Sequence, residues 1–185
     1  MNEIEILASK SIEGEDFLEA KRLLEPLAAN NSQYALMTLG WLYEIEKTTF
    51  RDMKLAESFY ERATKIGCLE AFNCLGRVLR AEGEFVKARD AFRTGAQSGN
   101  LGSMSWLGTM MLWGQGGPVD VDNGMLWLTA AAGEGHLVAK GQLLILERQK
   151  SKSIFRHIIY HIKRILLALR AAKDYSSVPY SGKLF

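Results

Sequence analysis

Apolar and small residues recur along the chain with the spacing of one helical face. In three stretches they occupy positions i, i+1, i+4, i+7 and i+8, and in each stretch a second, similar pattern follows. The first patterns begin at Ala35, Ala71 and Ser103, and the second patterns begin at Ala56, Ala88 and Gly124. Because this periodicity is that of an amphipathic α-helix, each stretch predicts a pair of helices.

The predicted helix pairs are copies of one unit. A Leu-Gly pair marks the same place in three of them, at 39–40, 75–76 and 107–108, and the first position recurs at residues 35, 71, 103 and 139. The spacings of 36, 32 and 36 residues are typical of solenoids, in which helical hairpins stack on one another. We therefore expect an all-α fold, a right-handed α-solenoid of about four repeats over residues 1–150.

The ends of the second helix of each pair are also marked in the sequence. An acidic residue precedes each of these helices, and a glycine follows three of them. The acidic residues are Asp16, Asp52, Glu84 and Asp120, and the glycines are Gly67, Gly99 and Gly135. A carboxylate caps free N–H groups at a helix start, and glycine adopts the left-handed conformation that ends a helix. These residues therefore have structural roles.

The repeated unit resembles the SLR (Sel-one-like repeat) family, a branch of the tetratricopeptide-type helical solenoids. The resemblance rests on Leu107-Gly108, Gly114-Gln115-Gly116, Val119-Asp120, Trp127 and Ala131-Ala132-Gly133. It extends over nearly all of residues 1–150, although segment 44–50 lacks the glycines of the family's loop between helices. It implies a scaffold for protein complexes, often bacterial, and a few relatives are linked to the binding of cell-wall compounds.

A binding surface follows from the same resemblance, which assigns residues of the first helix of each pair to the concave side of the solenoid. These residues are Met37, Trp41, Glu44, Asn73, Arg77, Arg80, Ser105, Thr109 and Trp113. Trp and Arg are common interface anchors, so the expected partner is a protein or peptide with acidic and apolar features. Alternatively, Trp41 and Trp113 fill space between hairpins.

The composition changes after residue 147. Residues 1–147 hold 14 Lys and Arg against 20 Asp and Glu, whereas residues 148–185 hold nine basic residues and one acidic residue. At about 100° per residue, eight isoleucine, leucine and phenylalanine residues between Ile154 and Leu169 lie within an arc of about 140°, and the basic remainder is interrupted by Tyr160, Leu167 and two alanines. We therefore expect a basic amphipathic helix over residues 151–173, followed by a flexible tail over residues 174–185.

Three interpretations of this helix remain open. It caps the last repeat, it docks on an anionic membrane surface, or it inserts into a groove of a partner protein. The residues expected to dock on a membrane or partner are Phe155, Arg156, Ile159, Ile162, Lys163, Leu166 and Arg170. Charges interrupt the helix too often for it to span a bilayer. Nucleic acid is disfavoured, because the acidic body would repel phosphates. The oligomeric state stays open.

The sequence contains no constellation typical of an enzyme. His157 and His161 have a metal-capable spacing but no third ligand nearby, and Gly114-Gln115-Gly116-Gly117 lacks the Lys-Ser/Thr of a phosphate-binding loop. We expect no enzyme activity, no cofactor and no metal. Cys68 and Cys74 are expected to be reduced and packed. The acidic start of the chain does not resemble a secretion signal, which favours a cytoplasmic location, with peripheral binding at the inner membrane face if the helix docks there.

Overall fold

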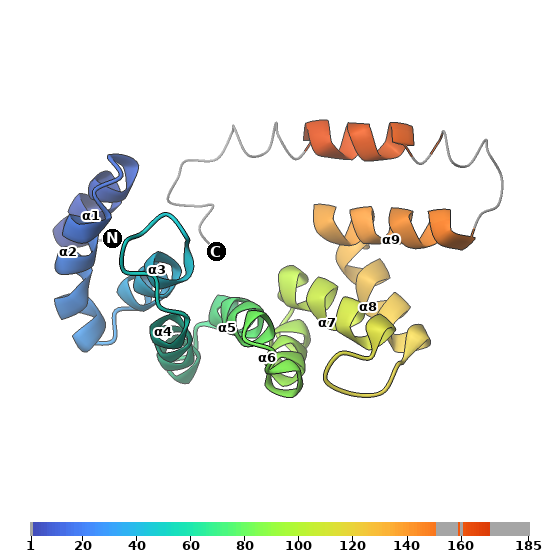
Figure 1. The fold of residues 1–185 in the computed structure, drawn as a ribbon, viewed down its shortest axis with the longest axis horizontal. Helices are drawn as coiled ribbons and strands as arrows, with labels where there is room; N and C mark the ends of the chain where they lie inside the picture. Colours follow the sequence, from blue (N-terminus) through green and yellow to red (C-terminus); the bar gives the residue numbers. More distant parts are fainter. Residues whose placement is uncertain (1, 151–158, 160, 171–185) are drawn as a thin grey trace. The chain divides into compact units, whose positions relative to one another are not determined.

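The computed structural model describes residues 2–150, 159 and 161–170. These residues are helical or lie in the connections between helices, and they contain no strand. The labelled helices are α1 (Glu3–Glu13), α2 (Phe17–Ala29), α3 (Gln33–Glu44), α4 (Met53–Lys65), α5 (Leu69–Ala81), α6 (Phe85–Gln97), α7 (Leu101–Trp113), α8 (Val121–Gly133) and α9 (Leu137–Lys150) (Figure 1). A further helical segment covers residues 161–170. The all-α prediction is confirmed.

The chain divides into two compact units. Unit 1 contains residues 1–91, and unit 2 begins at Phe92, so the boundary falls within α6. The single domain expected over residues 1–150, with a separate helix over residues 151–173, stays a prediction. The tail expected over residues 174–185 lies outside the described residues.

Unit 1 packs its helices closely because small residues recur at their contacts. Ala20, Ala35 and Ala56 are completely buried, together with the larger side chains of Leu39 and Tyr60. The helices α3 and α4 form one hairpin, and α5 packs on α4. At Gly40, a Cβ atom would lie 2.7 Å from the ring of Tyr60, a distance that side chains do not adopt. The glycine of the repeated Leu-Gly pair therefore allows the second helix of the hairpin to approach the first.

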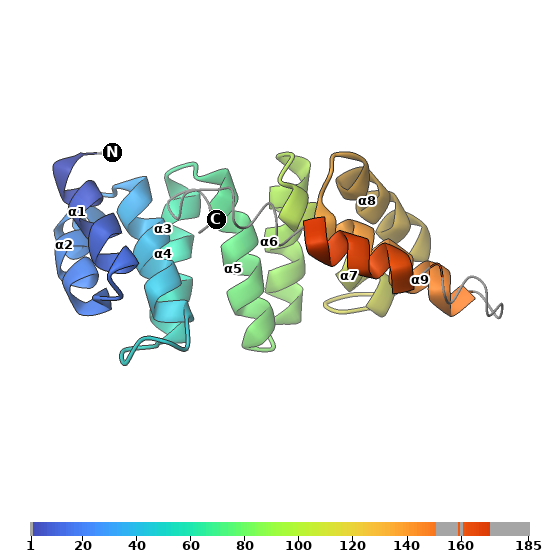
Figure 2. The same cartoon turned by 90° about the horizontal axis from the view of Figure 1, so that it is seen from above.

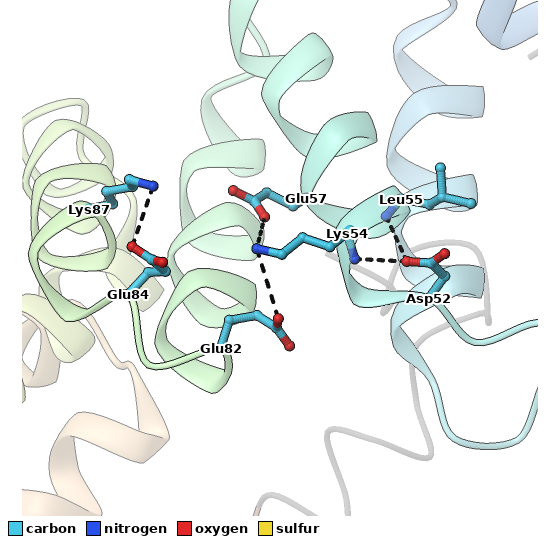
Figure 3. A network of polar contacts seen from close by, with 7 residues as sticks. All are labelled: Asp52, Lys54, Leu55, Glu57, Glu82, Glu84 and Lys87. Atoms are coloured by element: carbon cyan, nitrogen blue, oxygen red, sulfur yellow. Dashed lines mark hydrogen bonds and ion pairs between the residues drawn. The ribbon is translucent and has the colours of Figure 1, made fainter.

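The predicted helix starts are largely confirmed. Asp16, Asp52 and Asp120 each accept backbone hydrogen bonds from the first turn of the following helix, with distances of 2.9 to 3.1 Å. Figure 3 shows the cap at Asp52 beside an exposed network in which Lys54 Nζ lies 3.0 Å from Glu57 and 3.9 Å from Glu82. Glu84 stands 3.3 Å from Lys87 in the same view. Such exposed ion pairs contribute at most about 1 kcal/mol each.

The predicted glycines at helix ends are confirmed as well. Gly67, Gly99 and Gly135 have φ angles of +88°, +87° and +96°. Residues with a Cβ rarely adopt this left-handed conformation, so glycine turns the chain there at little steric cost.

Unit 2 repeats the hairpin in α7 and α8. At Gly108, a Cβ atom would lie 2.7 Å from the carbonyl oxygen of Gly124 and 2.9 Å from Leu128 Cγ. Beyond this contact, Leu128, Ala131 and Ala139 form a buried core between α8 and α9. The helix over residues 161–170 lies beside α9 (Figures 1 and 2). Among the described residues, no helix is both long and apolar enough to cross a membrane.

Candidate partner-binding surface

Three helices of unit 1 meet at one polar cluster. Arg77 in α5 donates a hydrogen bond from Nη2 to Oε1 of Glu44, the last residue of α3. The hydroxyl of Tyr60 in α4 donates to the other oxygen of Glu44 over 3.0 Å. The ring of Tyr60 is buried, whereas the side chain of Arg77 keeps 37% of its surface exposed. The Glu44 carboxylate thus joins two neighbouring hairpins at their surface.

The protonation states of this cluster follow from its surroundings. Burial raises the pKa of the Tyr60 hydroxyl well above its usual value, and the nearby Cys74 and Glu44 add to the shift. Burial also raises the pKa of the Cys74 thiol to about 12. Arg77 is partly desolvated, which lowers its pKa, but the adjacent Glu44 gives a net rise. At neutral pH the tyrosine and the thiol are therefore neutral, Arg77 is charged in its ion pair with Glu44, and Cys74 is not an activated nucleophile.

The residues expected on the concave side of unit 1 have different environments. Met37 is buried, at 2% exposure, so its side chain offers no surface to a partner in this structure. Trp41 is half-buried, and its ring meets Phe17 of α2 edge-on at 6.4 Å between centroids. Asn73 and Arg80 are half-buried on α5. Trp41 therefore packs on a neighbouring helix and also keeps exposed surface.

The residues expected on the concave side of unit 2 also differ among themselves. Ser105 is buried, whereas Trp113 at the end of α7 is 60% exposed and does not fill space between hairpins. The hydroxyl of Thr109 is hydrogen-bonded to the side chain of Gln142 in α9 and lies 2.7 Å from the Ser105 carbonyl oxygen. Thr109 therefore links two helices of this unit.

Three side-chain polar atoms on α3 and α5 are buried without a hydrogen-bond partner among the described residues. They are the hydroxyl oxygens of Tyr34 and Thr38 and the side-chain oxygen Oδ1 of Asn73. Asn73 lies one turn before Arg77 on α5, and Tyr34 lies seven residues before Trp41 on α3, so each shares a helical face with a predicted site residue. The sequence analysis missed Tyr34, although its helical spacing from Trp41 could have indicated it.

The residues expected to dock on a membrane or partner are described in part. Ile159, Ile162 and Leu166 are 50 to 60% exposed. Lys163 lies 3.8 Å from Glu147 of α9, and Arg170 is exposed. Phe155 and Arg156 lie outside the described residues.

The sequence also offered metal-capable histidines and two cysteines as candidates for chemistry. Among the described residues, no group of three or more His, Cys, Asp or Glu side chains could hold a metal ion. Cys68 and Cys74 are buried free thiols, as predicted. His161 is exposed, and its predicted companion His157 lies outside the described residues.

Comparison with solved structures reveals proteins of the same architecture. A Sel1 repeat protein from Oxalobacter formigenes aligns with a TM-score of 0.61 and 24% identity, over 68% of this chain and 52% of that one. A protective antigen of uropathogenic Escherichia coli that displays an SLR fold aligns with a TM-score of 0.65 and 26% identity, over 70% of this chain and 28% of that one. This chain therefore spans about half of the first protein and less than a third of the second.

At the level of sequence, no family model matches the chain, and no curated protein matches it. The structural likeness nevertheless confirms the resemblance found in the repeat pattern. The chain is a helical repeat protein with an all-α solenoid fold of the SLR type.

Proposed function

We propose that this chain, a helical repeat protein with the SLR fold, is a non-enzymatic scaffold that binds a protein partner on the α3 and α5 faces of unit 1. The carrying observation is that α3 and α5 present partly exposed side chains of types common at interfaces, the half-buried Trp41 and Asn73 and the side chain of Arg77, which is 37% exposed.

The expected ligand is an extended peptide segment with an apolar side chain. The helices α3 and α5 run in the same direction, because each is joined to α4 by a short connection that reverses the chain. Trp41, one turn before Glu44, and Asn73, one turn before Arg77, therefore lie at similar heights. The exposed part of Trp41 would contact the apolar side chain, and the exposed part of the Asn73 amide would hydrogen-bond to the main chain of the peptide.

An acidic side chain, also expected from the sequence, would have to compete for Arg77. The charge of Arg77 is already matched by Glu44. We therefore expect apolar character and main-chain hydrogen bonding to contribute more to affinity than acidity. This preference distinguishes the proposed surface from an open cationic site.

Peptides selected from a random display library on the full-length chain would test the proposal. Their affinities would be measured by calorimetry against the wild-type chain and the variants Asn73→Ala, Trp41→Ala and Phe85→Ala. Phe85 is the matched control, because it is an exposed aromatic residue of α6. We expect Asn73→Ala to weaken binding about tenfold, as for one lost hydrogen bond, with no loss of thermal stability.

Asn73→Ala separates binding from folding, because it removes an acceptor that has no partner in the described structure. Trp41→Ala should abolish binding but also lower the stability, since the ring packs on Phe17. If selected peptides bind Asn73→Ala and Trp41→Ala as tightly as the wild-type chain, this surface is not the binding site. If Phe85→Ala alone weakens peptide binding, the binding site lies on α6 instead.

A further inference from the structure

In the hairpins α3–α4 and α7–α8, the second helix packs closely on the first helix. The helix over residues 161–170 cannot pack on α9 in this way. In the earlier copies, the residue after the repeat's leucine is glycine, and Gly40 and Gly108 both have the next helix within 3 Å of an added Cβ. The corresponding residue of α9 is Leu144, because Leu143 stands at the position of Leu39 and Leu107. The leucine side chain prevents the close approach that the glycines permit.

The contact between this helix and α9 is correspondingly narrow. Leu167 Cδ2 lies 3.4 Å from the position of a Cβ at Gly141, and Lys163 Nζ lies 3.8 Å from Glu147. Open cavities of about 480 and 500 Å³ flank this contact line, and Leu144 lines both. The lysine and glutamate are about half exposed, so their ion pair contributes little. The helix is therefore held weakly to the body of unit 2.

Most of the apolar side chains of this helix point away from α9. At about 100° per residue, five of them occupy an arc of about 120° whose centre lies about 140° from Leu167, the residue that contacts α9. This outer arc consists of Ile159, Ile162, Ile165, Leu166 and Leu169, and Leu166, at the edge of the arc, also lines the cavity of about 480 Å³ beside α9. All five are between 50 and 62% exposed. A cap on the last repeat would bury this arc, whereas the described arrangement leaves it largely exposed.

The charges around the outer arc indicate which surface would cover it. Lys163 and Arg170 border the arc on one side, Arg164 lies farther round, and residues 161–170 include no acidic residue. A second copy of the helix would bring the same cations together at close range, which is unfavourable. An anionic lipid surface matches both features, because it offers hydrocarbon to the arc and phosphates to the basic border.

We propose that this helix docks the protein on an anionic lipid bilayer, lying in the interface with the outer arc toward the acyl chains. Lys163 and Arg170 contact lipid phosphates, and Lys163 exchanges its weak contact with Glu147 for them. The helix lies on the membrane and does not cross it. This inference goes beyond the proposed scaffold function, and it would place the peptide-binding unit at a membrane surface.

Flotation of the full-length chain with vesicles tests the proposal. One set of vesicles contains phosphatidylcholine alone, and the other contains phosphatidylcholine mixed with phosphatidylglycerol, each at low and high salt. We expect binding to the anionic vesicles only, and release by high salt, since surface electrostatics are screened. Lys163→Gln combined with Arg170→Gln should weaken binding about thirtyfold, and Leu166→Gln should weaken it at least about tenfold.

Matched controls separate the helix from the rest of the surface. Leu126→Gln changes a leucine of α8 that is 65% exposed, compared with 60% for Leu166. Lys54→Gln combined with Lys87→Gln removes two exposed cations of unit 1 (Figure 3). Both controls should bind vesicles like the wild-type chain. Trp41→Ala should also leave vesicle binding unchanged, so failure of the scaffold proposal and failure of this one are distinguishable.

Several outcomes would overturn the inference. Equal binding to neutral and anionic vesicles would contradict a role of the helix. So would a loss of vesicle binding in the control variants as large as the loss in the helix variants. Absence of binding to either vesicle would do the same. Light scattering gives a further check: if the lipid-free chain is a dimer that Leu166→Gln converts to a monomer, a second copy covers the outer arc.

Discussion

The guanidinium of Arg77 in α5 donates a hydrogen bond to the carboxylate of Glu44 at the end of α3, so that one ion pair connects two successive repeats. The resemblance to helical-repeat families assigned both residues to the expected binding side. The structure reveals that they also bind each other. Residues of this surface are therefore part of the packing of the solenoid as well as candidates for contact with a partner.

Removing one member of this pair should destabilise unit 1. We expect Arg77→Met to lower the free energy of unfolding by about 1–3 kcal/mol, between the values for exposed and buried pairs, because Glu44 would lose its cationic partner in a half-buried site. Urea denaturation of the full-length chain measures the change. The double variant with Glu44→Gln should lose less than the sum of the two single changes, and strict additivity would show that the pair has no coupling energy.

Gly40 should not tolerate a side chain. We expect Gly40→Ala to destabilise the protein by about 1–3 kcal/mol, because its Cβ would lie 2.7 Å from the Tyr60 ring. Gly133→Ala is the matched control, since a Cβ there meets nothing within 4 Å at the end of α8. That change should be neutral or slightly stabilising. Thermal melts of both variants would decide the matter, and equal melting temperatures would contradict the close helix contact.

Alkaline pH should unfold unit 1 through Cys74 and Tyr60. Burial raises the pKa of Cys74 from 9.0 to about 12 in the folded state. The folded state therefore keeps a proton that the unfolded state loses, and stability falls as the pH rises from 9 toward 12, by up to about 1.4 kcal/mol per pH unit. Urea titrations across this range measure the slope. Cys74→Ala should reduce the slope of stability against pH between pH 9 and pH 10. Above this range, ionisation of Tyr60 in the unfolded state also contributes to the slope.

The start of α9 should be sensitive to acid. His136 Nδ1 accepts a hydrogen bond from the Ala139 N–H over 3.3 Å, and burial lowers the pKa of His136 below 6.5. The folded state thus favours the neutral imidazole ring of His136. The contribution of this ring to stability is complete above pH 6.5, the pKa in the unfolded state, and is lost as the pH falls through the lower pKa of the folded state. We expect His136→Asn, which keeps a capping acceptor, to remove this pH dependence. Melting temperatures from neutral to mildly acidic pH test this, and an unchanged profile would contradict it.

The repeat period, the helix pairs, the acidic caps and the glycine stops were all readable from the sequence, because each depends on local spacing. Apolar periodicity determines which face of a helix is buried, and caps act within one turn. The Leu-Gly pair that includes Gly40 and Gly108 marked equivalent positions of the repeat, whereas the close approach of the next helix at these glycines was found in the structure. The basic amphipathic character of residues 161–170 was equally evident.

Only the tertiary structure decided how these elements use their side chains. Spacing alone could not reveal that Glu44 binds Arg77, that Met37 and Ser105 are buried, or that Tyr34 and Asn73 keep polar atoms without partners, since these facts depend on neighbouring helices. The orientation of the last helix is the clearest case. Its periodicity defined an apolar arc, but the contact of Leu167 with Gly141 places most of this arc on the side away from α9.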